Sequence, residues 1–150
     1  MVLYIKDFMI RNMTSVCDCD TLEYAIELMQ KTQMTVLPVV DKKNIYLGSI
    51  YSRNLLKNIL PEEYGYLESA RLLHNVNQAA NNLHEIRRKL VKDYMSKKVI
   101  ALKDSDEMKH VAEIMLKNKE SVLFITNEIG RLRGYINRGD LLYYLLKAGE

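Results

Sequence analysis

The stretch GSIYSRNLL at residues 48–56 occurs a second time, 86 residues later, as GYINRGDLL at residues 134–142. The correspondence continues without a gap from Ile5, which aligns with Val91, to Leu60, which aligns with Leu146. Identical residues are spread over the whole alignment, at Lys6/Lys92, Asp7/Asp93, Met9/Met95, Asp18/Asp104, Asp20/Asp106, Glu27/Glu113, Met29/Met115, Lys31/Lys117, Leu37/Leu123, Gly48/Gly134, Ile50/Ile136, Leu55/Leu141 and Leu56/Leu142. A chance register would not hold over that length, so the chain contains one structural unit twice.

The overall composition is that of an ordinary globular domain. The chain has 150 residues, of which 48% are hydrophobic and 27% are charged, and only two are proline. This length can bury a continuous core, and the composition predicts no disordered tract. The net charge of +3 is small and evenly spread, which argues against a nucleic-acid partner.

Three features of the sequence bear on where the protein is located. The first residues, Met1 to Met9, are apolar but interrupted by Lys6 and Asp7, so we expect no secretory signal. No run approaches the roughly 18 apolar residues of a membrane span, so we expect no membrane partner. Cys17 and Cys19 are too close in an extended segment to form a useful structural disulfide, which is typical of a reducing compartment. We therefore expect a cytoplasmic protein.

The tripeptide Cys17-Asp18-Cys19 is also a candidate for part of a metal site. Two thiols need further ligands, and the sequence has no CxxC motif and no matched histidine. We interpret the pair as inert thiols at the edge of a strand, and we expect neither a metal nor a cofactor.

Each copy is predicted to fold as a turn, a strand, a helix, two strands and a second helix. Asp20 is interpreted as the cap of the first helix, with Glu23 three residues later, and Asp106 repeats the pattern. Apolar residues then follow at helical spacing, at Leu22, Ala25, Ile26 and Met29 and at Met108, Val111, Ala112 and Met115. The apolar runs at 36–40 and 122–125 predict buried strands, and the last helices are expected at 54–60 and 140–146.

The residues between the copies, Pro61 to Leu90, are predicted to contain a helix. Apolar residues recur there at alternating spacings of four and three, at Leu72, Val76, Ala79, Leu83, Ile86 and Leu90. We favour a connecting helix that lies on its own domain, and an intermolecular coil remains the alternative.

The Leu37-Pro38-Val39-Val40-Asp41 strand end and the motif Gly-x-Ile-x-x-x-Asn/Asp-Leu-Leu resemble the CBS (cystathionine β-synthase) domain. The duplication resembles a tandem CBS pair. The resemblance implies an α/β (α+β) fold with two pseudo-twofold-related repeats, at 1–60 and 91–150, joined by a helical connector at 61–90. Each repeat would be a small mixed sheet with two amphipathic helices.

The resemblance also implies a function. Tandem CBS pairs are generally regulatory modules that bind adenosyl ligands in clefts between the repeats, so we expect AMP, ADP, ATP, S-adenosylmethionine or cyclic di-adenylate as the ligand. Binding would be signalled to an unknown protein partner through a conformational change. A homodimer is also implied, formed through amphipathic helices such as Leu22 to Met29 and Met108 to Met115.

The ligand signature of this family is Gly, two apolar residues, Thr or Ser, two variable residues and Asp. The acid accepts hydrogen bonds from ribose hydroxyls, while the hydroxyl residue and the helix N-terminus hold phosphate. The second copy keeps the acid and reads Gly134, Tyr135, Ile136, Asn137, Arg138, Gly139, Asp140. The first copy departs at both positions, with Tyr51 in place of the hydroxyl residue and Asn54, after Arg53, in place of the acid. The second motif is therefore the better candidate for an occupied site.

The slot for adenine would be lined by the extended segments and the strand ends, at Met13, Thr14 and Ser15, at Val99, Ile100 and Ala101, and at Thr35 and Ser121. Which segment pairs with which motif stays open. Asp140 and Asn54 also have a role without a ligand, because each precedes an apolar helix where an N-cap contributes about 1 kcal/mol. Arg53 and Arg138 are equally consistent with solvated surface residues.

Motifs for catalysis do not occur in the sequence. It contains no GxxxxGK[ST], GxGxxG, HExxH or GxSxG pattern. We therefore expect no enzyme, and the alternative to a ligand sensor is a ligand-free interaction or dimerisation module.

Overall fold

The computed structural model describes residues 2–60 and 69–149. The first repeat contains a 3-10 turn (Ile5–Asp7), β1 (Val16–Cys17), α1 (Leu22–Thr32), β2 (Val36–Val40), β3 (Tyr46–Tyr51) and α2 (Ser52–Ile59). After α3 (Ser69–Ile86), the second repeat contains a 3-10 turn (Val91–Asp93), α4 (Met108–Asn118), β4 (Val122–Thr126), β5 (Leu132–Asn137) and α5 (Arg138–Ala148). The predicted order of elements is confirmed, except that residues 99–103 form no strand and only Lys103 makes an isolated bridge, to Thr126.

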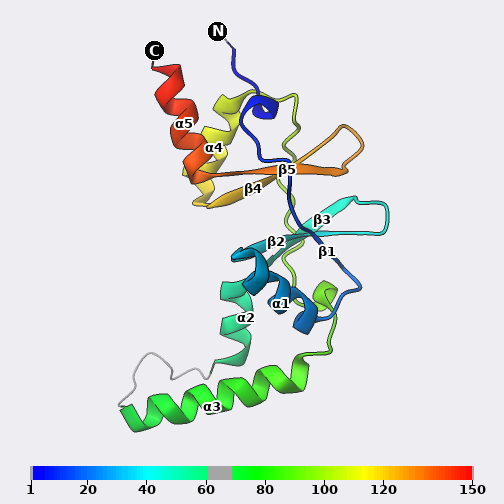
Figure 1. The fold of residues 1–150 in the computed structure, drawn as a ribbon, viewed down its shortest axis with the longest axis vertical. Coiled ribbons are helices and arrows are strands. Elements are labelled where there is room, and N and C mark those ends of the chain that lie inside the picture. The colour runs from blue at the N-terminus through cyan, green and yellow to red at the C-terminus, as the bar shows by residue number, and fades with distance from the viewer. Residues whose placement is uncertain (1, 61–68, 150) are drawn as a thin grey trace.

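Each repeat builds a small sheet around an antiparallel pair of strands. Leu37 of β2 lies opposite Ile50 of β3, and the equivalent residues Leu123 of β4 and Ile136 of β5 lie opposite each other. In the first repeat β1 adds a parallel strand beside β2. Figure 1 shows the two sheets facing each other at the centre of the molecule. Their facing side chains form a shared apolar cluster of Val36, Val40, Phe124 and Leu132.

The amphipathic helices pack their apolar stripes onto their own half of the molecule. Leu22, Ala25 and Met29 of α1 are buried, and so are Met108, Val111 and Met115 of α4. These stripes fill the core of the single chain, so a dimer face on these helices would have to use their other side chains. The large apolar side chains that remain outside on α4 and α5 are other ones, among them Leu116, Leu142 and Leu146.

The cap of α1 is not the one expected. Thr21 is the N-cap, and its hydroxyl accepts a hydrogen bond from Tyr24 N over 3.2 Å. Asp20 instead accepts a hydrogen bond from Cys17 N over 2.8 Å, and Asp106 does the same for Lys103 N over 2.9 Å. Both aspartates therefore stabilise the turn that precedes a helix.

The opening turn of each repeat packs into the other repeat. Ile5 and Met9 are buried in the core of the second repeat, and Val91 is buried in the core of the first. Backbone hydrogen bonds fix this exchange, from Ile5 N to Asp106 O over 2.9 Å and from Val91 N to Asp20 O over 2.8 Å. Figure 1 accordingly shows both chain ends beside the second repeat. The two repeats therefore share their cores and are not separate units.

The exchange explains the repeated glycines. After its turn, each opening segment crosses the last strand of the other repeat, and Ile10 pairs with Tyr135 while Ser96 pairs with Ser49. A Cβ atom on Gly134 would overlap the carbonyl oxygen of Ile10, and one on Gly48 would overlap that of Ser96. Glycine at both positions is thus required by the close approach of two backbones.

The connecting helix α3 lies on its own domain, as favoured from its apolar pattern. Ala79 is buried, and Leu83 lies beside Ile26 of α1 and Ile59 of α2. Asn82 Nδ2 donates a hydrogen bond to Ile59 O over 2.9 Å. The helix ends at Ile86, so the predicted heptad position at Leu90 falls outside it. The first part of the predicted connector, residues 61–68, lies outside the described residues.

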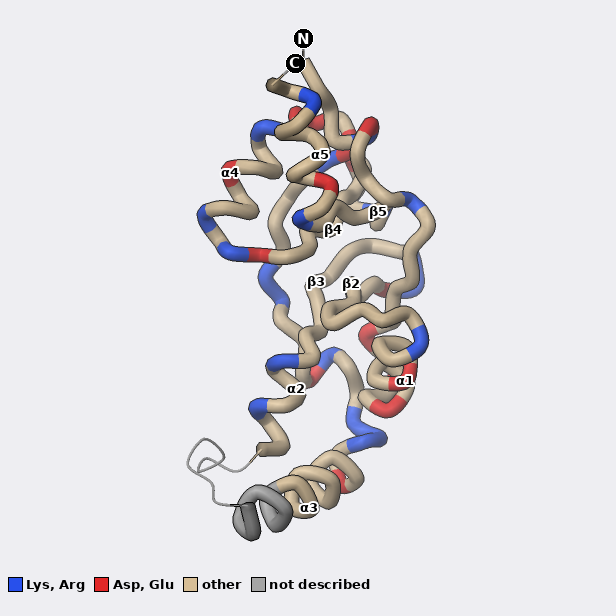
Figure 2. The backbone as a smooth tube through the Cα atoms, turned by 60° about the vertical axis from the view of Figure 1, so that its left-hand side comes forward, with Lys and Arg blue, Asp and Glu red and all other residues tan. Residues whose placement is uncertain are grey.

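Within residues 2–60 and 69–149, no helix has both the length and the apolar character needed to cross a membrane. Basic and acidic residues are interspersed along the chain in Figure 2, in agreement with the evenly spread charge of the sequence.

Candidate functional site

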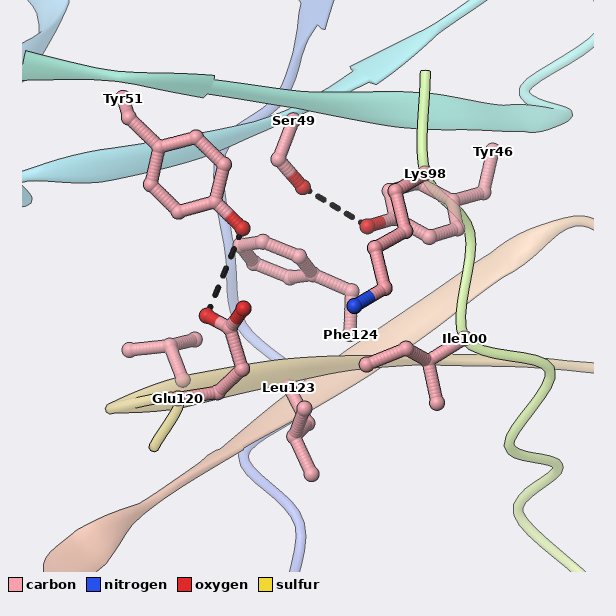
Figure 3. A pocket seen from close by; sticks show the side chains of 9 residues that line it. Tyr46, Ser49, Tyr51, Lys98, Ile100, Glu120, Leu123 and Phe124 are labelled. Carbon is pink, nitrogen blue, oxygen red and sulfur yellow. Dashed lines mark hydrogen bonds between the residues drawn. The ribbon is translucent and has the colours of Figure 1, made fainter. Parts of the chain in front are cut away.

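Two clefts lie between the repeats, and the internal repeat relates them. The first cleft is lined by Tyr46, Ser49, Tyr51, Lys98, Ile100, Glu120, Val122, Leu123 and Phe124 (Figure 3). The second cleft is lined by Asn12, Met13, Thr14, Thr32, Met34 and Tyr135. The offset of 86 residues pairs Asn12 with Lys98, Thr14 with Ile100, Met34 with Glu120 and Tyr135 with Ser49.

Each motif shares a cleft with the extended segment of the other repeat. Tyr51 of the first motif faces Lys98 and Ile100, whereas Tyr135 of the second motif faces Met13 and Thr14. This arrangement follows from the exchanged opening segments, which cross β3 and β5 beside the clefts. The question left open by the sequence is thereby answered.

The first cleft is nearly filled by its own side chains. Tyr51 Oη donates a hydrogen bond to Glu120 Oε2 over 3.4 Å, and the hydroxyl groups of Tyr46 and Ser49 are hydrogen bonded over 2.7 Å. The guanidinium of Arg53 stacks 4.4 Å from the centre of the Tyr51 ring, as in a cation–π contact. The remaining cavity has a volume of about 20 Å³, which is enough for about one water molecule.

Both phenols of the first cleft remain protonated at neutral pH. Burial raises the pKa of Tyr46 to about 12. The pKa of Tyr51 is also raised, first by burial and then by the negative charge of Glu120. Tyr51 is therefore a hydrogen-bond donor to a carboxylate, which favours the closed arrangement.

The second cleft is open. Its cavity volume is about 220 Å³, which approaches the roughly 300 Å³ at which ligand pockets begin. The ring of Tyr135 and the thioethers of Met13 and Met34 provide apolar, polarisable walls. Asn12 and Thr14 are exposed and provide polar groups at the rim.

Asp140 and Asn137 cap α5 together. Asn137 is the N-cap, and its Oδ1 accepts a hydrogen bond from Asp140 N over 3.0 Å, while Asp140 Oδ2 accepts one from Asn137 N over 2.9 Å. Asp140 is therefore not the N-cap, as considered from sequence, but the third residue of the helix in a capping box. In the described parts of the chain, Oδ1 of Asp140 and Nδ2 of Asn137 make no hydrogen bond. Capping thus uses only half of each side chain.

Asn54 occupies the equivalent place in α2 without the equivalent bonds. It is the third residue of the helix, and the N-cap is Tyr51, which makes no side-chain cap hydrogen bond. The expectation that Asn54 is an N-cap is therefore wrong. Its backbone oxygen accepts a hydrogen bond from Asn58 Nδ2 over 2.9 Å.

The other predicted site residues lie around the clefts and do not line them. Val99, Ala101, Thr35 and Ser121 are exposed, and Ser15 is half-buried. Arg138 Nη2 donates to Lys119 O over 3.4 Å, next to Gly139 at the start of α5. Gly134 is covered by the Ile10 backbone. Asp140 itself does not line the second cleft, although β5 leads from Tyr135 directly to the capping box.

Several lining residues were not predicted from the sequence. They are Asn12, Thr32, Met34, Tyr46, Ser49, Lys98, Glu120, Val122, Leu123 and Phe124. Two of them could have been found from the internal repeat. Glu120 and Met34 are equivalent under the offset of 86 residues, and they directly precede the predicted site residues Ser121 and Thr35. The others depend on which side chains turn toward the cleft.

The comparisons with known proteins agree with the fold and the duplication. The family model described as "CBS domain" matches residues 5–61 and 91–147. An uncharacterised protein of Methanocaldococcus jannaschii, MJ1426, is 26% identical over 97% of this chain and 92% of its own length. A second protein of that organism, MJ1225, is 26% identical, and this chain spans about half of it (46%).

Solved structures give the same result for the fold. The structure of the CBS-pair protein CBSX2 from Arabidopsis thaliana superposes with a TM-score of 0.79 at 21% identity, covering 99% of this chain and 98% of that chain. A structure described as CBSX2 in complex with AMP superposes with a TM-score of 0.71 at 21% identity, covering 99% of both chains.

Proposed function

We propose that this chain, which belongs to the CBS domain family and carries the domain twice, is a regulatory module that binds an adenosyl compound in its second cleft. The observation that carries the proposal is the open second cleft beside a half-used capping box. The cavity of about 220 Å³ is lined by Tyr135 near the C-terminal end of β5. Asp140 follows in the first turn of α5, and its Oδ1 is free of hydrogen bonds to the described residues.

The chemistry of the second cleft suits an adenosyl ligand. A flat purine fits between the Tyr135 ring and the methionine side chains, and Asn12 and Thr14 can bond to its polar edge. The free oxygen of Asp140 accepts from ribose hydroxyls, and Asn137 Nδ2 together with the N-terminus of α5 suits a phosphate. AMP, ADP and ATP, S-adenosylmethionine and cyclic di-adenylate share the adenosyl part. The structure of CBSX2 with AMP supports this choice of ligand class.

A regulatory role requires that the ligand prefers one of two shapes of the protein. The second cleft is bounded by both repeats, so a ligand there changes how the repeats contact each other. The homodimer implied by the family would use the exposed apolar side chains of α4 and α5, where Leu116, Leu142 and Leu146 are 72%, 67% and 67% exposed. We expect Leu142→Lys to convert such a dimer to a monomer in light scattering, and an unchanged mass would place the interface elsewhere.

The ligand is identified by thermal melting with AMP, ADP, ATP, S-adenosylmethionine and cyclic di-adenylate. A ligand at a hundredfold excess over its Kd stabilises the protein by about 2.7 kcal/mol. The test variant is Asp140→Asn, because its amide oxygen can still accept from Asn137 N while its NH₂ group replaces the free acceptor. We expect it to keep most of the unliganded stability and to lose the shift caused by the ligand.

The control is Asn54→Ala, which changes the equivalent position beside the closed cleft and should keep the shift. Equal loss from Asp140→Asn and Asn54→Ala would show that the sites are ranked wrongly. If none of the adenosyl compounds moves the melting temperature, the protein is a ligand-free interaction module.

A further inference from the structure

The turn between β1 and α1 gathers three potential metal ligands that the proposed function does not use. The sulfur atoms of Cys17 and Cys19 and a carboxylate oxygen of Asp18 all lie within 4.8 Å of one another. Cys17 Sγ donates to Asp18 Oδ1 over 3.4 Å, and Cys19 N donates to Cys17 Sγ over 3.5 Å. Cys19 is exposed and Cys17 is half-buried, so the group is open to solvent.

The fold does not require these thiols, because the second repeat forms the same turn without them. Lys103, Asp104 and Ser105 occupy the equivalent positions. The backbone hydrogen bonds of the two turns are equivalent. Asp18 N donates to Val40 O over 3.1 Å, as Asp104 N does to Thr126 O over 3.2 Å. Lys92 N donates to Asp18 O over 3.1 Å, as Lys6 N does to Asp104 O over 3.0 Å. Neither the backbone of this turn nor the aspartate that caps it therefore requires cysteine at positions 17 and 19.

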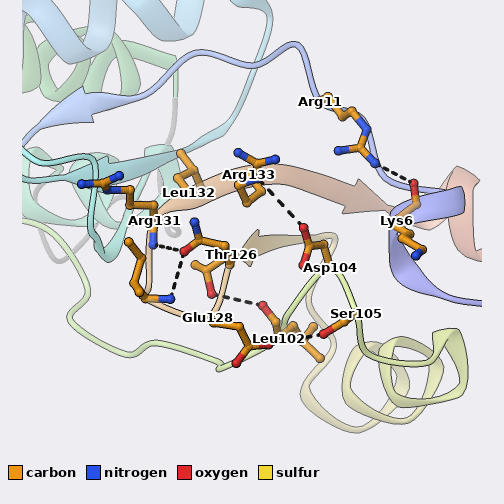
Figure 4. A network of polar contacts seen from close by, with 12 residues as sticks. Lys6, Arg11, Leu102, Asp104, Ser105, Thr126, Glu128, Arg131, Leu132 and Arg133 are labelled. Atoms are coloured by element: carbon orange, nitrogen blue, oxygen red, sulfur yellow. Dashed lines mark hydrogen bonds and ion pairs between the residues drawn. The ribbon is translucent and has the colours of Figure 1, made fainter.

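The two turns differ in what surrounds their side chains. In the second repeat, Asp104 Oδ2 lies 4.0 Å from Arg133 Nε, and Ser105 Oγ donates to Glu128 Oε1 over 3.4 Å (Figure 4). The offset places Leu47 and Lys42 at the positions of Arg133 and Glu128. Among the described residues, the Asp18 carboxylate forms no ion pair and bonds only to the Cys17 thiol. It is therefore available as a ligand.

We propose that Cys17, Asp18 and Cys19 bind a thiophilic divalent cation of the Zn²⁺ class through two sulfurs and one carboxylate oxygen. On sequence alone the two thiols lack further ligands, and in the structure Asp18 adds a third. Each thiol passes its proton to the buffer as a metal–sulfur bond forms, and water takes the fourth position. Two sulfurs about 2.3 Å from a tetrahedral Zn²⁺ lie roughly 3.8 Å apart, which is inside the 4.8 Å within which all three ligand atoms lie.

The backbone holds this cluster in place before any metal binds. The Asp20 carboxylate fixes Cys17 N, and Asp20 N donates to Cys17 O over 3.0 Å. The main chain at Cys17 and Asp18 is thus already held by hydrogen bonds, so metal binding has mainly the side-chain torsions to fix. A pre-organised chelate of this kind binds more tightly than the same tripeptide in an unfolded chain.

The test is a titration of the reduced, chelator-treated full chain with Co²⁺, followed by displacement with Zn²⁺. We expect a thiolate-to-cobalt absorption band that saturates at one metal per chain and disappears on adding Zn²⁺. Cys19→Ser and Asp18→Asn should each weaken Zn²⁺ binding at least tenfold. No thiolate band in the wild type, or one metal per two chains, would overturn a site within a single chain.

The matched control is the double variant Cys17→Lys/Cys19→Ser, which gives the first turn the side chains of the second. Because Lys103 and Ser105 already support this turn, we expect a melting curve like that of the wild type and no thiolate band. If the double variant binds cobalt with an unchanged spectrum, the ligands are elsewhere. If Asp18→Asn keeps the wild-type affinity, the three-ligand site is wrong.

Discussion

Tyr51 donates a hydrogen bond to Glu120 across the first cleft and so connects the end of β3 to the residues before β4 (Figure 3). The equivalent residues of the second cleft are Asn137 and Met34. Asn137 is much smaller than tyrosine, and its Oδ1 is used to cap α5. The thioether of Met34 has no carboxylate that could accept a strong hydrogen bond across the cleft. The cavities accordingly differ, at about 20 Å³ and about 220 Å³. A fold with two related clefts thus has one that is closed and one that is open.

This asymmetry predicts one ligand per chain. The wild type should bind one adenosyl ligand per chain in isothermal titration calorimetry, because Tyr51 and Glu120 occupy the first cleft. The double variant Tyr51→Asn/Asn54→Asp, which copies the second motif, should bind two. Tyr51→Phe keeps the ring and should still bind one. Two ligands per wild-type chain would show that the first cleft opens despite the contact.

A second prediction concerns the crossing of the backbones. Gly134→Ala should lower the free energy of unfolding by about 1–3 kcal/mol, because the new methyl group overlaps the Ile10 carbonyl oxygen and a backbone must move. Gly149→Ala is the control, since its nearest neighbours would be 3.7 Å away, and it should change stability by less than about 0.5 kcal/mol. Urea unfolding measures both, and similar values for the two variants would contradict the crossing.

The exchanged turns predict that the repeats unfold together. Ile5→Ala removes a fully buried side chain from the second core and should cost roughly 2–5 kcal/mol. Since that turn is continuous with the first repeat, native-state hydrogen exchange should lose protection equally in β2 and β4. Val2→Ala, at a residue that is 52% exposed, should change neither. A loss confined to β4 would show two independent units.

The elements and the duplication could be predicted from the sequence because both depend on local patterns. The spacing of Leu22, Ala25 and Met29 determines one buried helix face, and its repetition at Met108, Val111 and Met115 determines the other. The caps were harder to predict. Thr21 and Asp20 are adjacent and both suit the N-cap, and only the backbone path shows that Asp20 bonds to Cys17 N.

The clefts could be predicted only in part, because their walls come from distant parts of the chain. Met13 and Thr14 lie opposite Tyr135 because the opening turn of the first repeat packs into the second repeat. No local sequence pattern indicates this packing. The closure of the first cleft likewise depends on Glu120, which reads in the sequence as an ordinary loop residue. Tyr51 stands out in the sequence as the residue in place of the signature hydroxyl, whereas no local pattern identifies Glu120 as its partner.

The last prediction concerns Tyr46, whose hydroxyl is bonded to the buried Ser49 over 2.7 Å. Tyr46→Phe should lower the free energy of unfolding by about 1 kcal/mol at pH 8, because Ser49 loses its partner.

Burial raises the pKa of Tyr46 from 10.0 to about 12 in the folded state, so the folded state holds this proton more tightly than the unfolded state. The stabilising contribution is complete below pH 10 and is lost as pH rises toward 12; by pH 11 the wild type has lost about 1.4 kcal/mol that the variant does not lose. Urea unfolding at pH 8 and pH 11 should therefore show a stability difference between the two proteins of about 1 kcal/mol at pH 8 that is close to zero or reversed at pH 11. A difference that stays constant between these pH values would mean that Tyr46 is not shielded from water.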